Sequence, residues 1–174
     1  MSKRISVFLN GDNLYAFQKK NFWVDPQAIL DWVNNQIGPV ADAYYYLSCL
    51  PQNTKQMTFV RALEHFGYIT RAKKGKRYEF ENDDGSGEVE YEFEKANLEV
   101  DFVCDLLTTQ AVYNTAVLIC PSKDALRPIE LIKASGKSVI VVGPTIYTSK
   151  DVIDTVGPRN FIDLSSIEEH IIRK

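Results

Sequence analysis

The sequence lacks several features that mark common functional classes, and each shortage excludes one of them. Its 174 residues include only two histidines, His65 and His170, so neither a histidine-based catalytic triad nor a zinc site is expected. No glycine-rich GxGxxG or GxxxxGKS/T loop follows a predicted strand, which argues against dinucleotide-binding and P-loop folds. No apolar run approaches the roughly 20 residues that span a bilayer, and the N-terminal apolar run is too short for a signal peptide. We therefore expect no membrane segment.

Cysteine and net charge are also sparse. Cys49, Cys104 and Cys120 lie in apolar contexts without CxxC spacing, which predicts reduced core thiols in a cytoplasmic protein. A net charge of −3 argues against a generally basic surface but leaves room for a local basic patch. With 45% apolar and 25% charged residues, residues 1–174 are expected to form a single globular domain around one core.

Apolar segments with strand patterns alternate with segments of helical periodicity. The predicted strands are residues 4–9, 41–47, 68–71, 115–120, 138–142 and 160–163. The predicted helices are residues 26–37, 53–65, 95–111 and 124–135, with a terminal helix from residue 165 or 166. This alternation predicts an α/β fold: a mostly parallel sheet with helices on both faces, a Rossmann-like sandwich.

The middle of the chain departs from this alternation. Two arms with apolar and charged residues at period two flank a run of turn formers, which predicts an inserted acidic β-hairpin over about residues 76–94. The arms carry a predicted outer row of glutamates: Glu79, Glu81, Glu88, Glu90, Glu92 and Glu94. A basic run precedes them: Arg71, Lys73, Lys74, Lys76 and Arg77. These cations could be solvated, could pair with the glutamates, or could contact phosphates.

Polar residues follow three apolar stretches that a parallel sheet would bring close together. The first apolar strand ends in Asn10, Gly11, Asp12 and Asn13, and the strand at residues 116–120 ends in Pro121, Ser122, Lys123 and Asp124. Asp101 and Asp105 lie between them, four residues apart on a predicted helix. Ligands of open α/β sheets bind outside the carboxyl ends of the strands, so gathered acids there predict a hard-cation site.

Each stretch also has a plainer interpretation. Asn10 to Asn13 could form an ordinary turn, since Asn, Gly and Asp are turn residues. Asp101 could be a first-turn acid that interacts with the helix dipole, and Asp105 could face solvent. Ser122 could cap the next helix, with Asp124 in its first turn. The coincidence of all three at the expected element ends favours a shared site.

The three stretches resemble the motifs of the NYN family, the LabA-like branch of the PIN-like nucleases. The family's D-G-x-N-L corresponds to residues 10–14, its K-x-V-D to residues 98–101, and its S-G-D-x-D-F to residues 120–125. The resemblance covers roughly residues 4–164. It implies a PIN-like sandwich that cleaves RNA with Mg²⁺ or Mn²⁺, and it makes a homodimer an expectation.

The resemblance, the gathered acids and the basic run together suggest roles for individual residues, although Asp105 has no clear counterpart in the family. The expected catalytic residues are Asp101, Asp124, Asn10 and Asn13, and the expected metal ligands are Asp101, Asp124, Asn10, Ser122 and Asp105. The expected nucleic-acid contacts are Lys73, Lys74, Lys76, Arg77 and Lys123. The aromatic residues Tyr15, Phe17, Phe22 and Trp23 could stack on unpaired bases, although core or dimer packing is favoured.

Several positions depart from the family pattern. Asn10 and Ser122 stand where the family has aspartates, Leu98 replaces its lysine, and Ala125 replaces its aromatic residue. Each lost charge weakens divalent-ion binding by an amount on the order of a few kcal/mol. Three functions therefore remain open. The favoured one is a metal-dependent endoribonuclease that uses Asp101 and Asp124. The alternatives are a catalytically inactive or weakened RNA-binding or regulatory domain (natural, or inactivated by an engineered Asn10) and a nucleotide or small-phosphate hydrolase.

Overall fold

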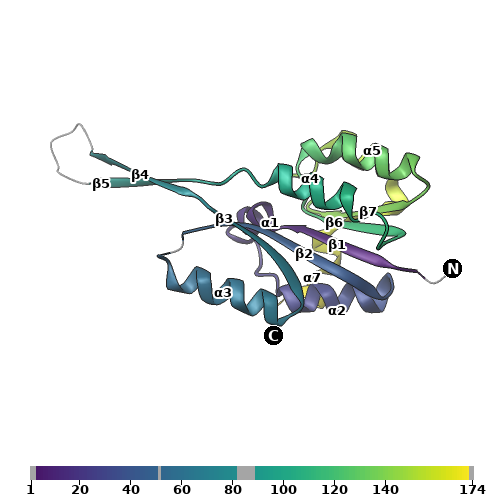
Figure 1. The fold of residues 1–174 in the computed structure, drawn as a ribbon, viewed down its shortest axis with the longest axis horizontal. Helices are drawn as coiled ribbons and strands as arrows, with labels where there is room; N and C mark the ends of the chain where they lie inside the picture. Colours follow the sequence, from purple (N-terminus) through teal and green to yellow (C-terminus); the bar gives the residue numbers. More distant parts are fainter. Residues whose placement is uncertain (1–2, 51, 82–88, 173–174) are drawn as a thin grey trace.

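The computed structural model describes residues 3–50, 52–81 and 89–172, and for residues 77, 79–81 and 89–93 it describes the backbone alone. A six-stranded parallel sheet forms the centre of the molecule (Figure 1). Its strands are β1 (Ile5–Asn10), β2 (Val40–Cys49), β3 (Tyr68–Lys74), β6 (Thr115–Ile119), β7 (Ser138–Gly143) and β8 (Phe161–Asp163). Every neighbouring pair in the order β3-β2-β1-β6-β7-β8 is parallel.

The strand order places a crevice beside β1. The chain winds outward from β1 through β2 to β3, then returns to the other side of β1 and winds outward through β6, β7 and β8. The order therefore reverses between β1 and β6, at the point where open α/β sheets bind their ligands. Asn10 ends β1 at this point, and Cys120 follows the last residue of β6.

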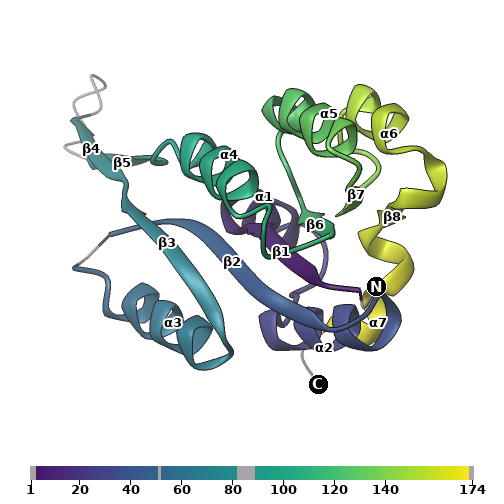
Figure 2. The same cartoon turned by 45° about the vertical axis from the view of Figure 1, so that its right-hand side comes forward.

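Helices cover both faces of the sheet (Figures 1 and 2). One face packs against α1 (Gly11–Gln18), α2 (Pro26–Gln36), α3 (Thr54–His65) and α7 (Glu168–Ile171). The other face packs against α4 (Glu99–Thr108), α5 (Leu126–Ala134) and α6 (Lys150–Val156). Short 3₁₀ helices lie at η1 (Lys123–Ala125), η2 (Pro158–Asn160) and η3 (Leu164–Ile167).

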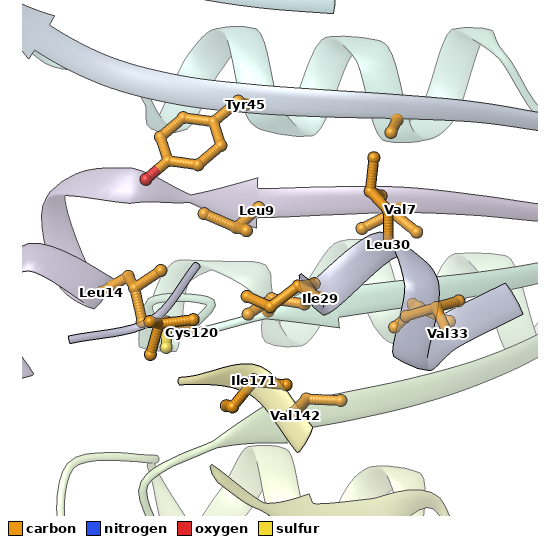
Figure 3. Close-up of a cluster of buried hydrophobic side chains, with 14 of the residues drawn as sticks. Val7, Leu9, Leu14, Ile29, Leu30, Val33, Tyr45, Cys120, Val142 and Ile171 are labelled. Carbon is orange, nitrogen blue, oxygen red and sulfur yellow. The ribbon is translucent and has the colours of Figure 1, made fainter. Parts of the chain in front are cut away.

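Two apolar clusters bury the two faces. Val7 and Leu9 of β1 meet Ile29 and Val33 of α2 in the first cluster (Figure 3). In the second cluster, Phe8 alternates to the opposite face and stacks on Tyr44 at 5.1 Å between ring centroids. Neighbouring strand residues thus bury opposite faces, as the pleat requires, and a strand covered on both sides is apolar throughout.

The predicted α/β class and its alternation of strands and helices are confirmed. The helix at residues 26–37 begins at Pro26 with Asp25 as its cap, whose carboxylate accepts a hydrogen bond from the Gln27 backbone N–H. Two helices, α1 and α6, have no counterpart among the predicted elements. The helix predicted from residue 95 begins at Glu99, because residues 95 and 96 are instead bound to the ends of α1 and β2. Lys95 Nζ donates to the Asp12 carbonyl, and the Ala96 N–H donates to Ser48 Oγ.

Strands β4 (Lys76–Glu81) and β5 (Val89–Glu94) form a separate antiparallel pair, which extends away from the six-stranded sheet (Figure 1). The predicted hairpin turn lies outside the described residues. The backbone register places Glu79 opposite Tyr91 and Glu92 opposite Tyr78. Directly opposed residues of an antiparallel pair share a face, so this register assigns the glutamate positions of β4 and β5 to opposite faces. The prediction of a single glutamate row was therefore wrong.

The three cysteines are free thiols. Cys49 and Cys120 are buried as predicted, whereas Cys104 is exposed. The prediction that all three are core residues was wrong for Cys104, because α4 turns its Phe102 and Leu106 positions toward the sheet and position 104 away from it. None of the helices within the described residues is long and apolar enough to cross a membrane.

Candidate functional site at the end of strands β1 and β6

Residues 10–13 join four elements at the carboxyl end of β1. Asn10 caps α1, since its Oδ1 accepts a hydrogen bond from the Asn13 backbone N–H at 3.1 Å. The Asp12 carboxylate accepts hydrogen bonds from Ser48 N and Ser48 Oγ, which ties α1 to the end of β2. Asn13 Nδ2 donates to the Cys120 carbonyl at 3.0 Å and so ties α1 to the end of β6. The predicted turn is thus the start of a helix, because Asn serves helix caps as well as turns.

Gly11 permits the close approach of α1 to β2. A Cβ atom at this position would lie 2.2 Å from Tyr45 Cε1 and 2.7 Å from the Tyr46 carbonyl oxygen. Both distances are far below van der Waals contact, so any side chain here would push α1 away from the sheet. The glycine therefore sets the position of Asp12 and Asn13.

The centre of the site is a carboxylate that sequence reasoning did not select. Glu99, in the first turn of α4, accepts a hydrogen bond from Asn10 Nδ2 at 3.2 Å through Oε1. Its second oxygen, Oε2, accepts a hydrogen bond from Ser122 Oγ at 2.8 Å. The two positions at which this chain departs from the family's aspartates thus bind the same carboxylate. We call Asn10, Glu99 and Ser122 the Glu99 centre.

Backbone strain lies next to this centre. Cys120 has a positive φ of 51°, a conformation that residues with a side chain seldom adopt. Its N–H still donates to the Val142 carbonyl, and burial raises the pKa of its thiol to about 12. The turn sends the chain from β6 into Pro121 and Ser122, where Ser122 caps η1 by accepting from the Asp124 N–H. Such strain is common at functional sites.

The other predicted acids lie elsewhere. Asp101 pairs with Lys73, and Asp105 pairs with Arg71 at 2.8 Å while accepting a hydrogen bond from the Tyr46 hydroxyl at 3.0 Å. Both acids thus face basic residues of β3, as their spacing of four on one helix allows. Asp124 is exposed on η1.

The residues of the Glu99 centre do not fit a divalent metal ion. The Asn13 N–H requires an acceptor, so Asn10 Oδ1 faces it and the Asn10 amide nitrogen faces Glu99. A carboxamide N–H₂ donates hydrogen bonds and does not ligate Mg²⁺ or Mn²⁺. Glu99 is the only charged member of the centre, and its charge is offset by two neutral donors instead of a cation. Within the described residues, no group of three or more His, Cys, Asp or Glu side chains is arranged to hold a metal.

A large cleft of about 1500 Å³ adjoins the Glu99 centre. It is bounded by the carboxyl ends of the strands and by α1, and Asn13 and Ser122 line it, whereas Asn10 and Glu99 do not. Five exposed lysines line it: Lys19, Lys20, Lys55, Lys95 and Lys123. Within the described part of the chain, the one lining carboxylate is that of Asp12, which already accepts two hydrogen bonds from Ser48. The cleft is therefore strongly basic although the chain is acidic overall.

Among the predicted nucleic-acid contacts whose side chains the structure describes, only Lys123 lines this cleft. Lys73 is held by Asp101 and by the Asn97 carbonyl. Lys74 and Lys76 are exposed away from the cleft, and the Arg77 side chain lies outside the described part of the chain.

The aromatic residues after the first motif divide between core and cleft. Phe17 is buried, and Phe22 packs against the same cluster at 5.2 Å between ring centroids. Tyr15 and Trp23 are exposed and line the cleft. The prediction of core packing was thus correct for Phe17 and Phe22, whereas Tyr15 and Trp23 face the basic cleft.

Two features of the site had weak signals in the sequence. Glu99 stands two residues before Asp101, and residues two apart on a helix face different directions, so selecting Asp101 excluded Glu99. The available signal for Glu99 was its position as an acid near the start of the predicted helix, within the family motif. The cleft lysines come from four segments that are far apart in sequence, and they form no basic run. Only the tertiary fold brings them together.

Comparisons with known proteins agree with this architecture. The NYN domain matches residues 4–165. The chain is 30% identical over 170 residues to the low amplitude and bright protein LabA of Synechococcus elongatus, covering 97% of this chain and 87% of that protein. A crystal structure of a protein of unknown function from Vibrio parahaemolyticus superimposes with a TM-score of 0.75 at 20% identity, covering 98% and 97% of the two chains, and shows the same fold. From the matched residues and the extent of the LabA likeness, the chain belongs to the NYN domain family.

Proposed function

We propose that this NYN domain binds RNA in the lysine-lined cleft and does so without divalent-metal chemistry at the Glu99 centre. Family membership suggests RNA as the polyanion. The observation that carries the proposal is the charge of the cleft: among its described lining residues are five lysines and one carboxylate, which is already bound to Ser48. Such a concentration of cations attracts phosphates in a chain whose net charge of −3 would otherwise repel them.

The position of the cleft supports the same function. Its lysines come from four separate segments: the residues directly after α1, α3, the segment before α4, and η1. They therefore surround the carboxyl ends of the strands, where ligands of this architecture bind. A chain of phosphates is better suited to cations that are spread over several elements than a single phosphate is.

The chemistry of the Glu99 centre separates binding from cleavage. A metal nuclease needs several charged oxygen ligands beside the scissile phosphate, and Asn10 and Ser122 instead donate N–H and O–H groups to Glu99. The metal-dependent ribonuclease is therefore the less favoured function for this chain. A mononucleotide hydrolase needs the same kind of centre and is disfavoured for the same reason.

The test is fluorescence anisotropy with a labelled single-stranded RNA of twelve nucleotides. We expect binding to persist in EDTA and to weaken with salt. For each tenfold increase in salt concentration, log Kd should rise by about 0.7 per contacted phosphate. We also expect the RNA to stay intact with Mn²⁺ and AMP to compete poorly. Loss of binding in EDTA, or cleavage that Glu99→Gln abolishes, would refute the proposal.

A pair of charge variants locates the binding surface. Lys95→Gln/Lys123→Gln removes two cations from the cleft, and Lys74→Gln/Lys76→Gln removes two from the basic run on β3 and β4. We expect the first variant to weaken binding about tenfold or more and the second to bind like the unmodified protein. The reverse order would assign binding to the basic run instead.

A further inference from the structure

Two large aromatic side chains are exposed beside the cleft lysines. Tyr15 on α1 is 45% exposed and Trp23, after α1, is 59% exposed, and both line the cleft. Their ring centroids are 6.0 Å apart with planes tilted by 59°. Exposed rings of this size lack the stabilisation that burial gives to Phe17 in the same segment. Their exposure therefore indicates a binding site for a partner.

Three hydrogen bonds fix the backbone of the segment that carries Trp23. The buried Gln18 side chain accepts a hydrogen bond from the Val24 N–H at 2.7 Å. Asn21 Nδ2 donates to the Phe17 carbonyl, and the Asp25 N–H donates to the Ile171 carbonyl. These hydrogen bonds fix the backbone on both sides of Trp23 and so pre-organise the two rings. Little conformational entropy is therefore lost when a ligand binds to them.

Cations accompany the rings. Lys19 Nζ lies 4.7 Å from the centroid of the Tyr15 ring, and Lys20 follows it in the cleft lining. Aromatic faces beside lysines are the combination that binds single strands, since bases stack on the rings while phosphates meet the cations. Ile146 and Tyr147, which are 77% and 57% exposed, also line the cleft and add apolar surface to it.

We propose that Tyr15 and Trp23 form a stacking platform for unpaired bases of a single-stranded nucleic acid, with Lys19 and Lys20 at its phosphates. The proposal rests on the RNA-binding function above and specifies the strand state that the cleft recognises. A duplex, whose bases are stacked on one another, presents no free base face to these rings and is not expected to use them.

A second copy of the chain is a less suitable occupant. A two-fold interface places the same patch of both subunits in contact. Here it would bring Lys19 and Lys20 toward the same lysines of the other copy, and like charges at close range are unfavourable. A polyanion instead carries the charge that complements these lysines.

Tryptophan fluorescence provides a direct readout, because Trp23 is exposed and the only other tryptophan, Trp32, is buried. In Trp32→Phe protein, we expect oligoadenylate of ten residues to quench the Trp23 emission. An abasic phosphodiester chain of the same length and AMP should each quench far less at equal nucleotide concentration. Equal quenching by the abasic chain would overturn the platform, and equal quenching by AMP would identify a free-nucleotide site instead.

Affinity measurements on the otherwise unmodified protein keep the test independent of Trp32→Phe. Tyr15→Ala and Trp23→Ala should each weaken oligoadenylate binding about tenfold, and Trp23→Phe, which keeps a ring, should weaken it less than threefold. If the unmodified protein binds the oligomer and both alanine variants bind it equally well, the platform is refuted while the RNA-binding function stands. If the unmodified protein binds no RNA, the function itself fails. A Trp23 emission that changes with protein concentration alone would show self-association and overturn the platform.

Discussion

The side-chain nitrogen of Asn10, and not its oxygen, faces Glu99, at 3.2 Å. The orientation follows from the helix cap, because Asn10 Oδ1 is engaged by the Asn13 N–H. An aspartate at position 10 could form the same cap, but it would present an oxygen to Glu99 in place of a donor. A single atom at this position therefore decides between a neutral hydrogen-bonded centre and a pair of carboxylates.

Asn10→Asp is expected to make the stability of the protein cation-dependent. In EDTA the two carboxylates repel, and we expect a loss of about 1–3 kcal/mol in the free energy of unfolding. Mn²⁺ should recover most of this loss in thermal denaturation, and adding Ser122→Asp should strengthen the response. The control is Asn10→Asp/Glu99→Gln, which exchanges the donor and the acceptor and should be stable without metal. An Asn10→Asp protein that is as stable as the original in EDTA would contradict this account.

Asp105 is expected to contribute to stability rather than to the site. Its carboxylate binds the Arg71 guanidinium through two hydrogen bonds and accepts another from Tyr46, whose ring is fully buried. Asp105→Ala should lower the free energy of unfolding by about 2–3 kcal/mol, because it leaves the buried hydroxyl without its acceptor. Tyr46→Phe should cost about 1 kcal/mol, and the double variant should cost less than the sum, as measured by urea denaturation. Additive losses would show that the two groups do not interact.

Gly11→Ala is expected to destabilise the protein although alanine is the better helix former. Backbone preference alone would favour alanine by about 0.5–1 kcal/mol. The added Cβ would lie 2.2 Å from Tyr45 Cε1, so we expect a net loss of about 1–3 kcal/mol and weaker RNA binding. Ala16→Gly, at an exposed position of the same helix, measures the backbone effect alone in chemical denaturation. A more stable Gly11→Ala protein would mean that α1 does not lie this close to β2.

The thiols predict a difference in reactivity and a loss of stability at high pH. At pH 8 a thiol reagent should label the exposed Cys104 promptly, and Cys49 and Cys120 only on unfolding. Burial raises the pKa of Cys120 from 9.0 to about 12, so above pH 9 the unfolded chain loses a proton that the folded chain keeps. This contribution to stability is therefore full well below pH 9 and is lost as pH rises, by about 1 kcal/mol between pH 9 and pH 10. Cys120→Ala should show a decline smaller by that amount in urea denaturation at the two pH values. Identical declines would place the Cys120 thiol in contact with solvent.

The sequence was informative where local pattern decides structure. The short apolar segments with strand patterns predicted all six strands of the sheet, and Asp25 and Pro26 marked the start of α2. The same local evidence was ambiguous at Asn10, since a turn and a helix cap use the same residues, and α1 was missed for that reason.

The amino-acid sequence by itself determined the order of strands and helices and the ends at which polar residues gather, because burial and capping act over a few neighbouring residues. Only the tertiary structure decided which of these residues meet. Glu99 reaches Asn10 across 89 positions, and lysines from four separate segments surround one cleft. Such meetings depend on how α4 and α1 pack against the sheet, and a rotation of α4 by two residues would have brought Asp101 there in place of Glu99.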